Sequence, residues 1–470
     1  MTPIVLSLVL AAAAQDVPNI VFEKYELPNG LDVILAPDRS TPIVHVNVWY
    51  HVGSREEKPG LTGFAHLFEH LMFQGSPSNP GEYFAPLEER GGSGLNGTTS
   101  FDRTNYFETV PSDQLPVALF LESDRMGWLL DTLDQAKLDN QREVVRNERR
   151  QRYENPPYGF ANRDLFEAVF PGDHPYHHMP IGSHEDLQAA SLDVVKDFFR
   201  TWYAPDNASL TITGDFDPAV AKKLVSQYFG EIPRSTAARE RRAATPVVLD
   251  GTRVIRQFQK VPEQRVWLAW PSPALLQPGD AELDLLSSLL TDGDDARLYK
   301  ALVKESGVAR RVVAYQQSLA LGSTFVIEAT PSKGHTTDEV VKAIDAVLAD
   351  TMGAKGPTID ELEAAKAGFQ VGYFASLATI AGRANTLQSY NLATGDPGYI
   401  TKDLARYAVA TPADVARVAG ETLQKSRIEL HIWPEADKPP EPPPPPAAPA
   451  PEPVPGKKKP KKTPRAEVKP

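Results

Sequence analysis

Two histidines and one glutamate stand close together between Gly63 and Phe73, where the other residues are almost all apolar. His66 and His70 are four residues apart, so in a helix they stack on one face with Glu69 beside them. Burying three titratable groups in an apolar helix costs free energy unless something compensates them. A divalent cation does so, because neutral imidazoles donate to it and a carboxylate can reach water bound to it. The pattern predicts a metal site, against the alternative of two core histidines paired with backbone carbonyls.

Such a site needs a third protein ligand, and a catalytic site keeps one position open for water. Glu148 is the candidate, because in a helix it shares a face with Gln141, Val144 and Val145 while the neighbouring arginines point elsewhere. An inward glutamate is more often paired with an arginine than with a metal. Beside the two histidines, Glu148 becomes the expected ligand.

The chain contains no cysteine, so any metal site must use histidine and carboxylate ligands. Two histidines and one glutamate in a tetrahedral site favour Zn²⁺, one ion per chain, with manganese and cobalt left open. A second group of histidines lies at His174, His177, His178 and His184. Its irregular spacing in a proline-containing loop favours turn and surface roles over a second metal site.

The elements that hold these residues follow from the apolar pattern. Helices are expected at residues 61–73, 115–130, 134–153 and 187–202. Alternation over residues 21–48 around Pro28-Asn29-Gly30 indicates a β-hairpin, and residues 208–212 read as a further strand. Strands and helices therefore come in clusters, which argues for an α+β fold with an antiparallel sheet rather than a doubly wound parallel one.

At 470 residues the chain is too long for a single core of ordinary size. The second half repeats the order of the first, with strands at residues 252–259, 266–270, 308–316 and 324–330 and helices at 281–290 and 296–305. Aligning the halves puts Asp284, Ser287 and Ser288 where the first half has the metal-site residues. The second half thus keeps the framework without the ligands.

The predicted organisation has five parts. They are a signal peptide at residues 1–14, a catalytic zinc-binding domain at 20–233, a linker at 234–250, a second homologous domain at 251–436 and a tail at 437–470. The leader is an apolar run ending in an Ala-x-Ala pattern, typical of a secretory signal, although it also fits a buried N-terminal segment. We expect export to a periplasm or the cell exterior.

Charge is distributed unevenly along the chain. The net charge is −12, but residues 438–470 carry eight Lys/Arg against three Glu, so the rest is close to −17. This strong negative charge of the rest of the chain argues against nucleic acid as a partner. The last 33 residues include fourteen prolines, a composition that predicts a disordered, solvated tail. Contact of this basic tail with an anionic membrane surface or envelope polymer is the functional alternative.

His-Leu-Phe-Glu-His, followed 78 positions later by Glu148, resembles the M16 (pitrilysin, insulysin, mitochondrial processing peptidase) metallopeptidase family, particularly its short two-domain members. The resemblance covers roughly residues 20–435. It includes Asn96-Gly97-Thr98-Thr99, similar to the family's Asn-Ala-x-Thr segment on the edge strand that receives substrate, and His174-Pro175-Tyr176 with Ile181-Gly182. It implies two homologous domains, each an antiparallel sheet with helices packed on one face.

Carried over by position, the resemblance makes His66, His70 and Glu148 the metal ligands and Glu69 the general base. The implied activity is hydrolysis of unfolded peptides by a metal-activated water. Asn96, Gly97 and Thr98 would bind the substrate as an added β-strand, whereas the bare sequence Asn-Gly also fits a tight turn.

Two departures from the family pattern bear on assembly. Gln141 stands where members often carry a glutamate that supports the ligands, and Val303 and Arg310 stand where a substrate-binding Arg and Tyr are expected. The resemblance therefore implies a catalytic subunit paired, around a closed chamber, with a homologous chain that lacks zinc ligands and supplies Arg and Tyr. A homodimer that uses Arg310 is the alternative. Two further classes stay open: a non-catalytic scaffold subunit, and an exported chaperone-like peptide-binding module.

Overall fold

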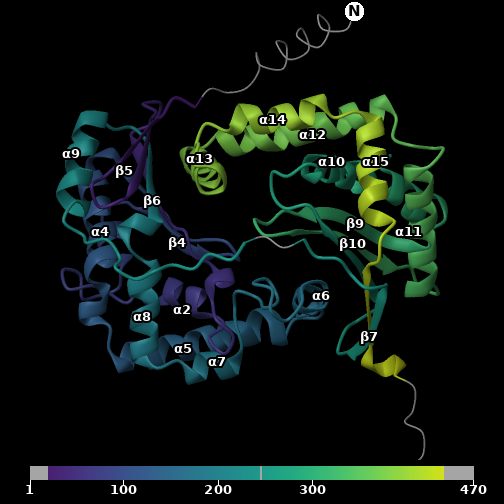
Figure 1. Ribbon diagram of the computed structural model, residues 1–470, viewed down its shortest axis with the longest axis horizontal. Helices are drawn as coiled ribbons and strands as arrows, with labels where there is room; N and C mark the ends of the chain where they lie inside the picture. The colour runs from purple at the N-terminus through teal and green to yellow at the C-terminus, as the bar shows by residue number, and fades with distance from the viewer. Residues whose placement is uncertain (1–19, 244–245, 439–470) are drawn as a thin grey trace, which may run out of the picture.

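The computed structural model describes residues 20–243 and 246–438. The expected signal peptide, and the expected tail beyond its first two residues, lie outside the described residues. Two sheets, each with its own layer of helices, face one another across the middle of the molecule (Figure 1). None of the helices described here is both long and apolar enough to cross a membrane.

The first sheet has six strands in the order β1-β2-β6-β3-β5-β4. They are β1 (Glu23–Glu26), β2 (Asp32–Pro37), β3 (Ile43–Tyr50), β4 (Ser93–Thr99), β5 (Thr104–Pro111) and β6 (Ala208–Gly214). β1 and β2 form the expected antiparallel hairpin. β3 does not continue that hairpin, because β6 lies between β2 and β3 and runs parallel to β2. β4 is left at the edge with one strand neighbour, β5.

The helices of this domain are α2 (Phe64–Leu71), α3 (Ala85–Glu88), α4 (Leu115–Thr132), α5 (Gln135–Arg149), α6 (Ala161–Val169), α7 (His184–Ala189), α8 (Leu192–Trp202) and α9 (Pro218–Phe229). The single helix expected at residues 187–202 is wrong: the chain forms α7 and α8 there. The break comes at Ser191, whose side chain accepts a hydrogen bond from Val194 N and so starts α8 as an N-cap. A π-helical turn at Arg150–Glu154 extends α5 up to the prolines at residues 156–157.

The second sheet has five strands in the order β7-β11-β8-β10-β9. They are β7 (Arg253–Gln259), β8 (Arg265–Ser272), β9 (Ala309–Gln317), β10 (Ser323–Pro331) and β11 (Ile428–Pro434). Its helices are α10 (Asp280–Thr291), α11 (Thr337–Met352), α12 (Ile359–Leu377), α13 (Ile380–Thr394), α14 (Ile400–Val409) and α15 (Pro412–Leu423). The segment expected to be a helix at residues 296–305 forms a π-helical turn, Tyr299–Glu305.

The two sheets share one plan. β7-β11-β8-β10-β9 corresponds strand for strand to β2-β6-β3-β5-β4, and α10 follows β8 as α2 follows β3. This confirms the expected pair of homologous α+β domains. Each sheet is mixed rather than purely antiparallel, because β2 with β6 and β7 with β11 run parallel.

Each domain also lends a helix to the other. α6 packs on β11 and β8 of the second sheet, where Leu165 and Phe166 join a core with Ile428 and Leu430. α13 of the second domain packs in turn on β3 and β6 of the first sheet (Figure 1). Helices of the same domain thus cover one face of each sheet, and a helix from the other domain covers the opposite face.

Candidate metal centre

Helix α2 is held firmly at its first turn. Gly63 precedes it with a φ of 90°, which favours glycine, and the buried Glu57 carboxylate accepts hydrogen bonds from Gly63 N and Ala65 N, both at 2.8 Å. Nε2 of His178 also lies within hydrogen-bonding distance of this carboxylate, at 2.9 Å. A carboxylate at a helix N-terminus satisfies orphan N–H groups and complements the helix dipole. Glu57 and His178 are therefore residues that position α2, a role that no local sequence pattern predicts for either of them.

The three expected ligands converge. His66 Nε2 lies 3.7 Å and His70 Nε2 lies 3.1 Å from Oε2 of Glu148, and ligand atoms of all three residues lie within 4.8 Å of one another. No other trio of His, Asp or Glu side chains in the described part of the chain converges in this way. The second histidine group is used otherwise, since His178 pairs with Glu57 and His184 with Glu154.

The donor set and its spacing fit a zinc ion. Zn²⁺ bound tetrahedrally by nitrogen and oxygen at about 2.0–2.2 Å places its ligand atoms about 3.4 Å apart. The two distances to Glu148 lie on either side of that value. Burial lowers the pKa of His66 to about 4, so its ring is neutral at neutral pH and can donate to a metal. Residues His66, His70 and Glu148 are thus suited to hold the ion.

Glu148 comes from α5 on a face narrower than expected. Gln141 and Val145 are buried beside it, but Val144 is 40% exposed, so the expectation that Val144 is buried on this face is wrong. Positions 141, 144, 145 and 148 follow the i, i+3, i+4, i+7 stripe, and position 144 lies at its solvent-exposed margin. Burial alone would raise the pKa of Glu148, but the hydrogen bond and charges from His70, His66 and Arg152 lower it overall.

Glu69 is hydrogen-bonded to the edge strand β4. Thr99 Oγ1, on β4, donates a 2.6 Å hydrogen bond to Oε2 of Glu69. A Cβ on Gly97 would lie 2.9 Å from Cγ of Glu69 and 3.1 Å from the ring of Phe73, so β4 rests directly on α2 there. Burial raises the pKa of the Glu69 carboxyl, and the Thr99 hydroxyl opposes that shift. The sequence motif that contains Thr99 does not by itself predict this contact with Glu69.

The remaining site residues lie nearby with different surroundings. Asn96, Gly97 and Thr98 belong to strand β4, so the tight-turn alternative does not describe them. Gln141 is buried on α5, but its amide donates to Asn140 at 3.4 Å and makes no hydrogen bond to the three ligands within the described residues.

In the second domain, the residue aligned with His66 has another use. Asp284 on α10 accepts a 2.6 Å hydrogen bond from Tyr407, and Ser287 bonds back to the carbonyl of Asp284. Val303 lies in the π-helical turn, and Arg310 pairs with Glu263. Neither residue therefore offers a free substrate-binding group at these positions of the same chain.

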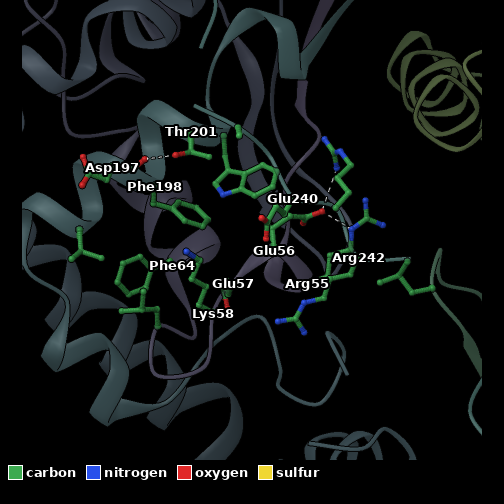
Figure 2. Close-up of a pocket in the computed structure, with 16 residues that line it drawn as sticks. Arg55, Glu56, Glu57, Lys58, Phe64, Asp197, Phe198, Thr201, Glu240 and Arg242 are labelled. Atoms are coloured by element: carbon green, nitrogen blue, oxygen red, sulfur yellow. Dashed lines mark hydrogen bonds and ion pairs between the residues drawn. The ribbon is translucent and has the colours of Figure 1, made fainter. Parts of the chain in front are cut away.

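A separate cavity of about 520 Å³ lies by the first turn of α2. Phe64 and Phe198 give it apolar walls, and Arg55 approaches from the rim, where Glu56 makes an ion pair with it (Figure 2). The cavity contains none of the three ligands. It is a hollow behind the metal-binding helix and separate from the centre itself.

The sequence matches two family profiles. The one described as "Insulinase (Peptidase family M16)" covers residues 32–172, and "Peptidase M16 inactive domain" covers residues 189–369. Zinc protease PqqE of Helicobacter pylori is 29% identical over 405 residues, 85% of this chain and 89% of its own length.

Solved structures agree with this. The crystal structure of a protease from Helicobacter pylori has a TM-score of 0.81 and 28% identity, covering 88% of this chain and 100% of that one. The periplasmic protease PqqL from Escherichia coli shares the fold, with a TM-score of 0.72 at 19% identity. The match spans 87% of this chain but 47% of PqqL, which is about twice as long.

Proposed function

The chain belongs to the M16 peptidase family, and from that membership we propose that it is a zinc-dependent endopeptidase acting on unfolded peptides. The observation that carries the proposal is the convergence of His66, His70 and Glu148 within 4.8 Å on elements that also hold Glu69 against an edge strand. The similarity to a protein named zinc protease supports it.

His66, His70 and Glu148 would hold one Zn²⁺, which when bound supplies Lewis acidity toward water and a peptide carbonyl. Glu69 would act as the general base and then as the general acid. Its Oε2 already accepts the Thr99 hydrogen bond, so Oε1 is the oxygen that takes a proton from water and later returns it to the leaving amine. The raised pKa of this buried carboxyl helps it to keep the proton between those two events.

The substrate would bind as a strand along β4. Ser100 N donates to Arg103 O at 2.8 Å, which closes the β4–β5 hairpin with a hydrogen-bonded pair. By the alternation of antiparallel pairing, Thr98 then bonds to β5, while the backbone groups of Gly97 and Thr99 face the open edge. Gly97 N donates there to Asn96 Oδ1 at 2.9 Å, an acceptor that a peptide carbonyl would replace. A peptide that pairs with those groups binds through its backbone, so varied sequences are accepted.

The active unit would include a second M16-type chain. PqqL reaches about twice the length of this chain in one polypeptide, and Arg310 is already paired with Glu263 here. A homologous subunit without zinc ligands would supply the missing Arg and Tyr, and a second copy of this chain is the alternative. We propose that this assembly lies in the periplasm or outside the cell, a proposal supported by the similarity to the periplasmic protease PqqL and by the leader-like pattern of residues 1–14.

Hydrolysis of a quenched oligopeptide tests the proposal. The purified chain, its Glu69→Gln variant and the chain stripped of metal are compared, each alone and with any M16-type product of the adjacent gene. We expect cleavage that needs zinc and that Glu69→Gln abolishes. Equal cleavage by Glu69→Gln would show that the base is misassigned. The absence of zinc-dependent cleavage in every combination would favour the scaffold or peptide-binding alternatives.

A further inference from the structure

Arg103 is a half-buried cation in the turn after the edge strand, on the face of the first sheet that meets α13 of the second domain. Its Nη1 donates to three neutral oxygens: Thr98 O at 2.8 Å, Thr98 Oγ1 at 2.5 Å and Asn105 Oδ1 at 2.9 Å. Its guanidinium carbon lies 5.1 Å from the ring centre of Trp49. The hydrogen bonds of Nη1 and the contact with the Trp49 ring therefore fix the orientation of the guanidinium.

No carboxylate lies within 4.0 Å of this guanidinium in residues 20–243 and 246–438. The adjacent Asp102 is committed elsewhere, since its Oδ1 binds Arg55 and Tyr176 and its Oδ2 accepts from Ala320 N. More deeply buried arginines of the chain are paired, as Arg125 is with Glu122. Burial lowers the pKa of Arg103 to about 10, which still leaves it charged at neutral pH. The charges of Glu69 and Asp102 act on it only from a distance, so the desolvated cation has no carboxylate in direct contact to offset its burial.

Asn105, which accepts a hydrogen bond from Arg103, is itself held in place. Asn105 donates to Asn47 at 3.1 Å, and Asn47 donates to Asn385 of α13 at 2.8 Å. This chain of amides runs from the second domain across the sheet to the oxygen that holds Nη1. The guanidinium is thus preorganised, which lowers the entropy cost of binding an anion.

The position suits a peptide bound along β4. Gly97 and Thr99 face α2 and Glu69, whereas Thr98 faces Arg103 on the opposite side of the sheet. Side chains of an added strand alternate in the same way, so the residue opposite Thr98 projects onto the face that meets α13. Directly opposed side chains in an antiparallel pair start about 4.5–5.5 Å apart, within reach of Asp or Glu across Thr98 to the guanidinium.

We propose that Arg103, with Trp49 and Thr98, forms a carboxylate-binding subsite that selects peptides with an acidic group opposite Thr98. The inference rests on the proposed function, because it needs a peptide strand along β4. The carboxylate can come from an Asp or Glu side chain or from the free C-terminus of a short peptide. Arg suits this task because its planar fork can bind a carboxylate with two parallel hydrogen bonds.

The first test compares pairs of quenched peptides that differ by Asp or Asn at one position at a time. We expect one position at which the wild-type chain prefers Asp by about tenfold in kcat/KM, the effect of one charge-assisted hydrogen bond. Arg103→Gln should bring that ratio close to one, whatever its effect on the absolute rate with the Asn peptide. Arg103→Lys should keep part of the preference, and Arg417→Gln on the exposed face of α15 should keep all of it.

A binding arm separates failure of the subsite from failure of the proposed function. Glu69→Gln, loaded with zinc, is titrated with the same labelled peptides by fluorescence anisotropy, each as the free acid and the C-terminal amide. Asp-selective binding lost in Glu69→Gln/Arg103→Gln supports the subsite even if no peptide is ever cleaved. Selectivity that follows the free C-terminus instead identifies the terminal carboxylate as the ligand. An unchanged Asp-to-Asn ratio without Arg103, or no acid preference at any position, overturns the inference.

Discussion

The hydroxyl of Thr99 donates a 2.6 Å hydrogen bond to Oε2 of Glu69 and so joins the open edge strand to the metal-binding helix. The edge that would receive a peptide and the carboxylate that would move its proton are thereby held in one geometry. Gly97 allows the close approach, because any Cβ at that position would contact the Glu69 side chain.

Replacing Thr99 by valine removes the donor and keeps the shape of the side chain. A hydrogen bond to a charged group contributes about 1.5–3 kcal/mol, so we expect kcat to fall about 10- to 100-fold with little change in KM. Steady-state kinetics on a neutral peptide measure this effect. Thr99→Ser, which restores the hydroxyl, should recover most of the rate.

The control is Thr201→Val on α8, where the hydroxyl bonds only to the backbone carbonyl of Asp197. It should leave kcat unchanged. A wild-type rate in Thr99→Val would mean that the hydrogen bond does not orient Glu69.

Zinc should stabilise the folded chain through its three ligands. A ligand at about 1,000 times its dissociation constant adds about 4 kcal/mol to the free energy of unfolding. We expect added zinc to raise the unfolding temperature of the metal-free chain, and His70→Ala and Glu148→Gln to abolish that rise. Differential scanning fluorimetry with metal analysis measures both.

Glu69→Gln is the matched control, because it alters the same helix without removing a ligand. It should keep both the bound zinc and the rise in unfolding temperature. A full response to zinc in His70→Ala would place the ion elsewhere.

The local parts of the site could be predicted from the sequence. His66, Glu69 and His70 lie within one helix, so their spacing alone fixes a common face, and Glu148 followed from its place beside Val145. The prediction failed for Val144, which was expected to be buried on the same stripe of α5 but is exposed. A helix's own period does not say how wide its contact with its neighbour is.

The parts that depend on long-range pairing could not be predicted. Insertion of β6 between β2 and β3 brings together residues about 170 positions apart, and no local pattern encodes that step. The bond from Thr99 to Glu69 likewise exists because β4 folds onto α2. The packing of α6 and α13 on the sheet of the opposite domain could not be predicted either. The apolar face of a helix does not indicate which surface it will pack against.

Asp284 should make stability depend on pH. Burial raises its pKa from 3.8 to about 7, so the folded chain keeps a proton that the unfolded chain loses at lower pH. The free energy of unfolding therefore falls as pH rises from about 4 to about 7, by at most about 4 kcal/mol from this group. Asp284→Asn should remove that loss and be more stable than the wild type at pH 8, but not at pH 4. Urea unfolding at both values measures the difference.

Asp294→Asn, at an exposed position of the same domain, removes the same charge without the burial. Its difference from the wild type should be small at both pH values. If Asp284→Asn behaved in the same way, the pKa of Asp284 would not be raised in the folded chain.

Gln388 should govern how firmly α13 of the second domain is docked on the first sheet. Its side chain is fully buried, and its amide donates to the carbonyls of Asn47 at 3.1 Å and Ser209 at 2.9 Å. Gln388→Leu withdraws both donors inside an interface, and buried groups left without a partner cost about 1–3 kcal/mol each. We expect faster hydrogen exchange in α13 and in the facing strands β3 and β6, measured by mass spectrometry. α10, which packs on β9 of the second sheet and away from this interface, should exchange as before. Gln370→Leu, at an exposed position of α12, is the matched control and should change neither region. A uniform rise over both domains would instead show that Gln388 supports the fold as a whole rather than this one contact.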